Sequence, residues 1–240
     1  FVAKNYRTLS ILVPVYNEEN TVHLILDKLD KVHLPNGLSK EIVVINDGSK
    51  DGSKERIETY IQTHPEVPVT FVNHKQNQGK GMALRSGIAV AQGDIITIQD
   101  ADLECDPADY PDMLPFILSG EFKVVYGSRF LKKENVHSYK TFYWGGRLVS
   151  IVANILYGLR LTDEPTCYKM FDADVLRSIP LECMRFEFCP EVTAKIAKRG
   201  YQIKEVPIHY YPRSKEEVKK VKWHDGIEAI WTLVKYRFHK

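Results

Sequence analysis

The stretch Ile95–Glu104 (IITIQDADLE) joins an apolar run to a cluster of acids. Its β-branched residues predict a strand buried on both faces of a parallel sheet, and the carboxylates follow where that strand ends. Open α/β sheets bind ligands at the carboxyl ends of their strands. Asp100, Asp102 and Glu104 are therefore predicted to hold a hard divalent cation, Mg²⁺ or Mn²⁺, against substrate phosphates. Taken alone, Asp-x-Asp also fits a solvated turn that caps the strand.

The first half of the chain alternates short β-branched runs with amphipathic stretches. This alternation is typical of an α/β protein with a Rossmann-like, mostly parallel sheet and helices on both faces. The expected strands are residues 9–13, 41–46, 69–73, 94–99 and 123–126. The expected helices are residues 18–32, 50–63, 79–91 and 107–118. The predicted order is therefore βαβαβαβαβ.

The second half is less regular and is expected to contain C-terminal amphipathic helices. Helical periodicity recurs at residues 142–158, 188–199 and 223–238. Strands are expected at residues 167–171 and 201–206. Residues 210–222 are polar and basic, which predicts a mobile loop. Because no repeat or low-complexity linker interrupts the 240 residues, we expect a single domain, residues 1–240.

Composition excludes several classes of protein. The formal net charge of +2 is too small to indicate a nucleic-acid partner, although residues 195–240 are basic and the first 194 are acidic. The four cysteines lack the spacing of a zinc site or a disulfide framework, which favours a reducing, cytoplasmic-side compartment. We expect no signal peptide and no membrane-spanning segment, so any membrane contact would be peripheral.

Three further motifs follow the predicted strands at the same end of the sheet. After the first strand, Tyr16 can stack on a base, and Glu18 begins a helix. After the second, Asp47 offers an acceptor to a base N–H or a ribose hydroxyl. After the third, Lys80 and the free N–H groups of a helix start can neutralise phosphate. Each motif alone is a common turn, but four in order predict a nucleotide-sugar site.

These ordered motifs resemble the inverting family 2 glycosyltransferases of the GT-A fold. The segments that carry this resemblance are Leu9–Glu18, Asn46–Ser49, Gly79–Gly81 and Asp100–Asp102. A second set is similar to dolichyl-phosphate mannose synthases and their relatives that act on polyprenyl phosphates. Its segments are Tyr126–Arg129, Asp163–Lys169, Ala197–Tyr201, Glu205–Ile208 and Tyr211–Arg213. Together the two sets cover nearly the entire chain.

The resemblance implies roles for individual residues. Those implied to contact the nucleoside are Pro14, Tyr16, Glu18 and Asp47. Those implied to address the metal and the diphosphate are Asp100 and Asp102, while Glu104 stands where family members often have Gln. Those implied to face the donor diphosphate or the lipid phosphate are Arg129, Arg213 and Lys215. The catalytic candidates are therefore Asp102, Arg129 and Arg213.

The expected mechanism follows from the charge of the acceptor. A phosphate monoester is already ionised near neutral pH, so it needs no general base. It must, however, approach a donor diphosphate of like charge, and an acid-bound metal with a basic loop would offset that repulsion. Attack in line with the departing nucleoside diphosphate would invert the anomeric carbon.

The resemblance implies transfer of a hexose to a polyprenyl or dolichyl phosphate at a membrane surface, and it favours mannose from GDP-mannose over glucose from UDP-glucose. Residues 1–127 would bind the nucleotide sugar. Residues 128–240 would bind the acceptor and face the membrane, with or without a membrane-anchoring partner protein. The expected location is the cytoplasmic side of a membrane.

Two other hypotheses stay open. In one, the same fold transfers the sugar to a hydroxyl acceptor with Glu191 as general base, since Glu187 and Glu191 fall near the catalytic acid of hydroxyl-using relatives. Glu191 also fits a helix start, where the dipole favours acids. In the other, the chain is a non-catalytic nucleotide-sugar-binding subunit, against which Asp100 and Asp102 argue. Trp144 and Trp231 fit a core, but they are also candidates, with Tyr143, Ile151, Ile155 and Val234, to enter a membrane interface. His209 fits an ordinary surface position.

Overall fold

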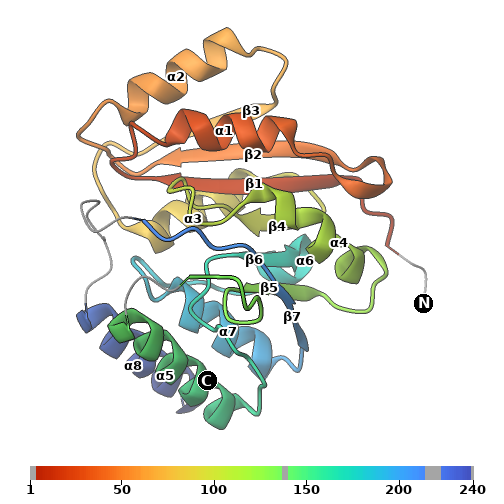
Figure 1. The fold of residues 1–240 in the computed structure, drawn as a ribbon, viewed down its shortest axis with the longest axis vertical. Helices are drawn as coiled ribbons and strands as arrows, with labels where there is room; N and C mark the ends of the chain where they lie inside the picture. The colour runs from red at the N-terminus through yellow and green to blue at the C-terminus, as the bar shows by residue number, and fades with distance from the viewer. Residues whose placement is uncertain (1–3, 137–139, 214–222, 239–240) are drawn as a thin grey trace.

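A seven-stranded sheet forms the centre of the molecule (Figure 1). The computed structural model describes residues 4–136, 140–213 and 223–238. Across the sheet the strands lie in the order β3-β2-β1-β4-β6-β5-β7. Their bounds are β1 Thr8–Val15, β2 Ser39–Asn46, β3 Val69–Asn73, β4 Ile95–Ile98, β5 Val124–Ser128, β6 Lys169–Asp172 and β7 Ile203–Pro207. The strands predicted in the first half are confirmed, with ends that differ by a few residues.

Helices cover both faces of the sheet (Figure 1). Their bounds are α1 Val22–Lys31, α2 Ser53–Thr63, α3 Lys80–Val90, α4 Tyr110–Leu118, α5 Lys140–Tyr157, α6 Ala173–Arg177, α7 Phe188–Lys198 and α8 Trp223–Phe238. Short 3-10 turns occur at Pro35–Gly37 and Pro107–Asp109. Helices α1, α2 and α4 contribute to the core on one face, and α3, α6 and α7 to the core on the other.

The central strands are buried on both sides, as their continuous apolar runs predict. In β4, Ile95 belongs to the core under α1 and α4, whereas Ile96 and Ile98 belong to the core under α3 and α7. The side chains alternate because successive residues of a strand point to opposite faces. The strand before the acids is therefore fixed from both sides.

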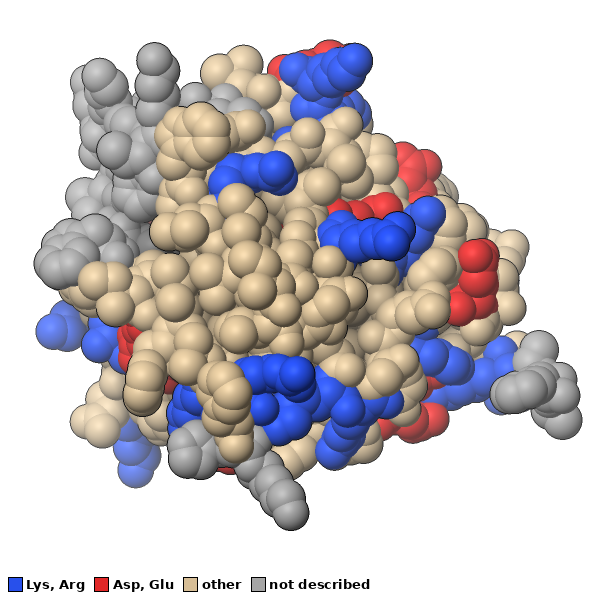
Figure 2. Space-filling view, turned by 90° about the horizontal axis from the view of Figure 1, so that it is seen from below, with Lys and Arg blue, Asp and Glu red and all other residues tan. Residues whose placement is uncertain are grey.

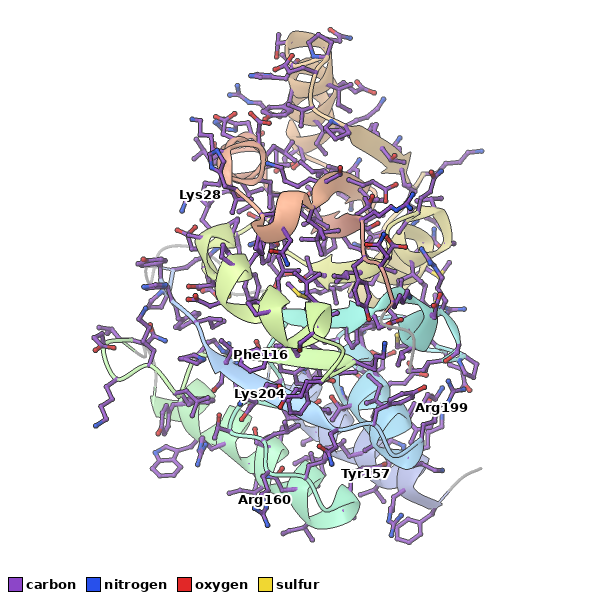
Figure 3. All side chains as sticks on the ribbon, turned by 90° about the vertical axis from the view of Figure 1, so that its right-hand side faces the viewer. Lys28, Phe116, Tyr157, Arg160, Arg199 and Lys204 are labelled. Atoms are coloured by element: carbon purple, nitrogen blue, oxygen red, sulfur yellow. The ribbon has the colours of Figure 1, made fainter. Side chains whose placement is uncertain are left out.

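The sheet is mostly parallel, with one antiparallel strand. β6 lies between β4 and β5 and runs antiparallel to both. Its last residue, Asp172, accepts a hydrogen bond from the Asp174 N–H and so caps α6, a short helix that the sequence analysis does not predict. β7 lies at the sheet edge beside β5, where the Lys204 ammonium sits 4.8 Å from the ring centroid of Phe116 on α4 (Figure 3).

Helices α5 and α8 form an outer layer that packs on α7 (Figure 1). Tyr157 of α5 donates a hydrogen bond to the Leu233 carbonyl of α8 at 2.6 Å. Trp144 and Trp231 are 67% and 65% exposed, which contradicts the interpretation that places them in a core and agrees with the alternative of an interface position. On the opposite face of α5 from Trp144, the small side chain of Ala153 lies in the core cluster that α5 forms with α7 and α8. No helix in the described part of the chain is long and apolar enough to cross a membrane.

Candidate active site

The loops that carry the predicted ligands leave the sheet at one edge, where β1, β2, β3 and β4 all end. These four strands are parallel, and their register places Val15 beside Asn46 and Asn46 beside Asn73. The Asp47 N–H donates to the Val15 carbonyl at 2.8 Å, which joins the exits of β1 and β2. This edge is the usual ligand edge of an open α/β sheet.

The acid loop, residues 100–106, is fastened from within the protein. Gln99 is fully buried, and its side-chain amide donates to the carbonyls of Asp100 and Cys105 at 3.2 and 3.1 Å. The Tyr110 hydroxyl donates in turn to the Gln99 Oε1 at 2.9 Å. Leu103 adopts a φ of +64°, which is uncommon for a residue with a side chain. The loop is therefore held in one conformation by groups other than a ligand.

Within this loop the carboxylates repel one another. Burial raises the pKa of Asp102 to about 7, and the negative charges of Asp100 and Glu104 add to the rise. The Glu104 N–H donates to Asp102 Oδ1 at 3.0 Å, and this hydrogen bond partly opposes the rise in the pKa of Asp102. A carboxylate crowded in this way is stabilised by an added cation.

Two cations reach this carboxylate cluster from other elements. Lys80, the first residue of α3, donates to Asp100 Oδ1 at 2.5 Å. Arg213, beyond β7, donates through Nη2 to Glu18 Oε2 at 2.6 Å, and its Nε lies 3.4 Å from the Asp102 carbonyl oxygen. The structure thus brings Glu18, Lys80, Asp100 and Arg213 together, as the sequence analysis expects of one site.

Arg129 is held by a residue to which the sequence analysis gives no role. Its Nε and Nη2 donate to the two carboxylate oxygens of the fully buried Asp163, both at 2.7 Å, and its backbone N–H adds a third bond. The guanidinium also lies 5.4 Å from the ring centroid of Tyr210. Bidentate pairing fixes the plane of the guanidinium. The sequence analysis gives Asp163 only as part of a motif, because Arg129 and Asp163 are far apart in the chain and no local pattern pairs them.

The Asp47 carboxylate is hydrogen-bonded to the loop that precedes α3. Its carboxylate accepts hydrogen bonds from the Asn77 side chain at 2.9 Å and from the N–H groups of Gln78 and Gly79 at 3.0 and 2.8 Å. His74 Nδ1 lies 2.8 Å from the same carboxylate. These contacts hold the loop that begins α3, so Asp47 shapes this loop in addition to any contact with a nucleoside.

The remaining predicted ligands differ in what the structure says of them. Pro14 and Tyr16 are half-buried at the end of β1, at the same edge as the acid loop. Lys215 lies outside the described residues, as do the loop residues 214–222 that follow Arg213.

Glu191 is engaged in the protein interior, which removes the base of the hydroxyl-acceptor hypothesis. It is fully buried and accepts hydrogen bonds from the N–H groups of Glu182 and Cys183 at 2.8 and 2.7 Å. Lys195 and the Tyr236 hydroxyl donate to it as well. Burial tends to raise the pKa of Glu191, but these bonds outweigh it and lower the pKa. Its place in the first turn of α7 agrees with the alternative of a helix-start residue.

His209, expected as an ordinary surface histidine, has a buried carboxylate partner. Its Nδ1 lies 2.6 Å from Asp109 Oδ1, and its backbone N–H donates to the other oxygen at 2.8 Å. Its Nε2 contacts the Lys132 ammonium. The pairs are far apart in sequence, so no local motif reports them. They fasten the segment that leads from β7 to Arg213.

The comparisons with known proteins agree with this geometry. The model of the family described as glycosyl transferase family 2 matches residues 10–179. The chain belongs to this family. The expectation drawn from the strand-end motifs is therefore confirmed at the level of the family.

Similar proteins of family 2 include enzymes named for polyprenyl phosphates. The chain is 24% identical over 205 residues to dodecaprenyl-phosphate galacturonate synthase of Rhizobium johnstonii, covering 85% of this chain and 59% of that protein. It is 28% identical over 226 residues to dolichyl-phosphate beta-glucosyltransferase of Dictyostelium discoideum, covering 84% and 66%. The chain thus spans about three fifths to two thirds of the length of the curated relatives it matches.

Solved structures with the same fold include glucosyl-3-phosphoglycerate synthase from Mycobacterium tuberculosis. Its complex with Mn²⁺, UDP and phosphoglyceric acid superposes with a TM-score of 0.70 at 22% identity, covering 98% of this chain and 80% of that one. A complex of the same enzyme with Mn²⁺, UDP-glucose and phosphoglyceric acid gives a TM-score of 0.70 at 20% identity. The predicted GT-A fold of this family 2 chain is therefore confirmed.

The GT-A resemblance implies a divalent metal, and the acid loop fits one with few protein ligands. In the described part of the chain no three His, Cys, Asp or Glu side chains are arranged to hold a metal ion by themselves. Glu104 is not supported as a third ligand: its Oε1 accepts from the Arg213 N–H at 3.1 Å and its Oε2 lies 3.4 Å from the Tyr210 hydroxyl. Mg²⁺ is commonly bound by one or two carboxylates plus substrate phosphates. Asp100 and Asp102 would provide the two carboxylates.

Proposed function

We propose that this chain transfers a hexose, with inversion, from a nucleoside diphosphate sugar to a polyprenyl phosphate. The observation that carries the proposal is the fastened acid loop, with Asp100 and Asp102 facing cations from α3 and from the segment after β7. Residues 1–127 would bind the donor, and residues 128–240 would bind the acceptor. The relatives named for dodecaprenyl and dolichyl phosphates support this acceptor class.

For the donor, the relatives favour the alternative over GDP-mannose. The Dictyostelium relative is named a glucosyltransferase, and the Rhizobium relative is named for galacturonate. The synthase of the same fold was solved with UDP-glucose. We therefore propose glucose from UDP-glucose as the first donor to test, with mannose from GDP-mannose as the second.

The proposed mechanism assigns each charged residue a task. A bound Mg²⁺ or Mn²⁺ would neutralise the donor diphosphate and stabilise the departing nucleoside diphosphate. Asp100 and Asp102 would hold that ion, and the Lys80 ammonium would help to neutralise the negative charge of the diphosphate. Arg213 would lie between the donor diphosphate and the acceptor phosphate, where like charges must approach. The acceptor phosphate oxygen then bonds to the anomeric carbon as the bond to the diphosphate breaks, and no general base is needed.

A membrane surface would supply the lipid acceptor, and the outer layer is suited to meet it. On α5 the exposed apolar residues recur at helical spacing: Trp144, Leu148, Ile151 and Ile155. On α8 they are Ile227, Trp231 and Phe238. Tyr143 and Val234, also predicted to enter the interface, are half-buried. The face of the molecule below α5 and α8 is largely uncharged, with Lys and Arg around it (Figure 2). Amphipathic helices of this type bind at anionic membrane surfaces.

The start of α5 connects this face to the site. Tyr143 packs edge-on against Phe130, with ring centroids 5.1 Å apart. Phe130 directly follows Arg129, which is predicted to face a phosphate. A lipid headgroup that reaches from the outer layer towards the acid loop would therefore pass this region.

Transfer of radiolabel into solvent-extractable lipid tests the proposal. Wild-type protein is incubated with Mn²⁺, polyprenyl phosphate and labelled UDP-glucose or GDP-mannose. Label should appear in lipid and be abolished by chelator. Asp102→Asn should lower the rate at least a hundredfold, because it removes a charge that holds the metal, roughly 2.7 kcal/mol or more of barrier.

The matched control is Asp112→Asn, which removes an exposed carboxylate from α4 and should leave the rate unchanged. Undiminished transfer by Asp102→Asn or in excess chelator would exclude the metal role. Transfer only to soluble hydroxyl acceptors would overturn the acceptor class. Donor binding without any transfer or hydrolysis would favour a non-catalytic subunit.

A further inference from the structure

Two of the four cysteines lie together beside Lys80. The Lys80 ammonium donates to Cys167 Sγ at 3.0 Å, and the Cys189 thiol donates to the Thr166 carbonyl at 3.4 Å. Thr166 directly precedes Cys167, so both thiols lie beside the same short segment of the chain. Lys80 bonds at the same time to Asp100 of the acid loop. A continuous chain of contacts therefore runs from the acid loop to a pair of free thiols on two different elements.

The surroundings of this thiol pair favour thiolate chemistry on Cys189. The neighbouring Cys167 thiol lowers the pKa of Cys189, against the effect of burial, and the positive charges of Lys169 and Lys80 lower it further. The Cys189 side chain and burial raise the pKa of Cys167. A thiolate near cations is the form that attacks disulfides. Both cysteines are partly exposed, so a small reagent can reach them.

The other two cysteines lack these conditions. Burial raises the pKa of Cys105 well above the usual range, and the charge of Asp102 adds to the rise. Burial also raises the pKa of Cys183, which lies in the interior. They provide natural controls within the same chain.

We propose that Cys167 and Cys189 form a disulfide with a low-molecular-weight disulfide such as oxidised glutathione as oxidant, and that this modification weakens donor binding. The effect on donor binding rests on the proposed function, because it assigns regulation to the same site. The formation of the disulfide does not depend on that function.

The exchange proceeds in two steps. The Cys189 thiolate attacks one sulfur of oxidised glutathione, forms a mixed disulfide and releases one glutathione thiolate. Cys167 loses its proton and attacks the Cys189 sulfur, which releases the second glutathione. The two cysteines lose two electrons and two protons, and one oxidised glutathione becomes two reduced molecules.

The disulfide would act on the acid loop through the segment before β6. A disulfide requires its two Cβ atoms to lie about 3.8 Å apart, so residues 166–169 and the start of α7 become tied to each other. Tyr168, next to Cys167, donates to the Asp106 carbonyl at 2.8 Å and stacks on Tyr110 at 5.3 Å. In the disulfide, Cys167 would also lack its thiol proton, although its sulfur contacts the Lys80 ammonium in the reduced protein. The supports of the acid loop would then shift together.

The first test counts thiols. Reduced protein is incubated with oxidised glutathione, freed of reagent, denatured and titrated. Wild type should fall from the four thiols of the chain to two, with a Cys167–Cys189 peptide in the non-reducing digest. Cys105→Ser, the matched control, should still lose two thiols. Cys167→Ser and Cys189→Ser should form no internal disulfide. Four remaining thiols in wild type, or a different pair in the digest, would overturn the modification.

The second test measures donor binding by calorimetry with Mn²⁺, using UDP-glucose and GDP-mannose as probes. The donor dissociation constant should rise about tenfold on oxidation of wild type and of Cys183→Ser, which changes a cysteine outside the acid loop, and dithiothreitol should restore it. In Cys189→Ser the donor dissociation constant should not change after treatment with oxidised glutathione. Equal binding by reduced and disulfide-bonded wild type would overturn the regulation. Binding of neither donor by the reduced protein would overturn the proposed function and the regulation, whereas the thiol count would still decide the disulfide.

Discussion

At the site edge, cations and carboxylates come in pairs drawn from different elements. Lys80 pairs with Asp100, and Arg129 pairs with Asp163. The Lys80–Asp100 pair is partly exposed and adds little to stability. The Asp163 carboxylate is fully buried, and there desolvation offsets much of the attraction to Arg129. Both pairs do fix where each positive group lies before a ligand arrives. Preorganised charge is the larger benefit for a reaction between phosphates.

Asp47→Ala tests whether the loop that begins α3 depends on this carboxylate. The variant leaves the N–H groups of Gln78 and Gly79 without their acceptor, so the loop should lose its fixed shape. We expect the donor dissociation constant to rise about tenfold or more, roughly 1.4 kcal/mol. Calorimetry with Mn²⁺ and donor measures it. Asp30→Ala, an exposed change on α1, is the control, and unchanged affinity in Asp47→Ala would contradict the prediction.

Arg213→Ala tests the cation between donor and acceptor. Removing the guanidinium should lower kcat/KM for polyprenyl phosphate at least tenfold, because the repulsion between the phosphates is no longer offset. The donor dissociation constant should change less, since Lys80 and the metal remain. Arg213→Lys should recover part of the loss by keeping the charge without the bidentate geometry. Normal acceptor saturation in Arg213→Ala would remove the residue from the acceptor site.

At the scale of elements, the β6–α6 junction is held to the start of the chain by one buried carboxylate. Asp172 is 2% exposed and accepts hydrogen bonds from Tyr6 at 2.7 Å, Lys123 at 2.9 Å and Lys4 at 3.1 Å. Burial alone would raise the pKa of Asp172, but these bonds outweigh it and lower the pKa to about 2. The antiparallel strand and the N-terminal segment are therefore stabilised only while the carboxylate is ionised.

Asp172→Asn should destabilise the protein by roughly 1–2 kcal/mol at pH 7. Because the folded pKa lies below the unfolded value of 3.8, the contribution is complete above about pH 5. It is lost as the pH falls through 4 towards 2. Urea unfolding of wild type and variant at pH 7, 5 and 3 measures the difference. Asp174→Asn, at the exposed partner of Lys4, should cost much less. A difference that stays constant down to pH 3 would contradict the assignment.

At the scale of the whole molecule, α5 and α8 give one face a different character from the rest. Their inner sides meet α7 through a small cluster, and their outer sides leave two tryptophans mainly exposed. A contiguous exposed apolar face is unusual for a protein without a partner surface. The Lys and Arg around it would favour an anionic membrane (Figure 2).

Vesicle co-sedimentation tests this face. Binding of wild type should rise with the fraction of anionic lipid and fall as salt screens the charges. The double variant Trp144→Glu with Trp231→Glu should bind at least several-fold more weakly, because it places charges where apolar groups would enter the interface. Leu24→Glu, at an exposed apolar position on α1, is the matched control and should bind like wild type. Equal binding by the double variant would place the membrane contact elsewhere.

Local sequence patterns are sufficient to predict the layers of the fold and the edge of the sheet that carries the site. Continuous β-branched runs required strands buried on both faces, and helical periodicity required helices to cover them. The strand predicted at residues 69–73 and the helix predicted at residues 223–238 have the same bounds in the structure. The acids after β4 were found because a strand and its exit are adjacent in sequence, and parallel strands end at one edge.

How distant segments meet depends on tertiary packing. The direction of β6 depends on its neighbours β4 and β5, and its own four residues carry no sign of it. Burial of Glu191 and exposure of Trp231 depend on which face of a helix finds a partner. The hydrogen bond from the Cys189 thiol to the Thr166 carbonyl joins α7 to the segment before β6. Periodicity reports that a face is apolar or that a residue can ionise, but pairing partners are set by sheet order and helix docking, which no local pattern contains.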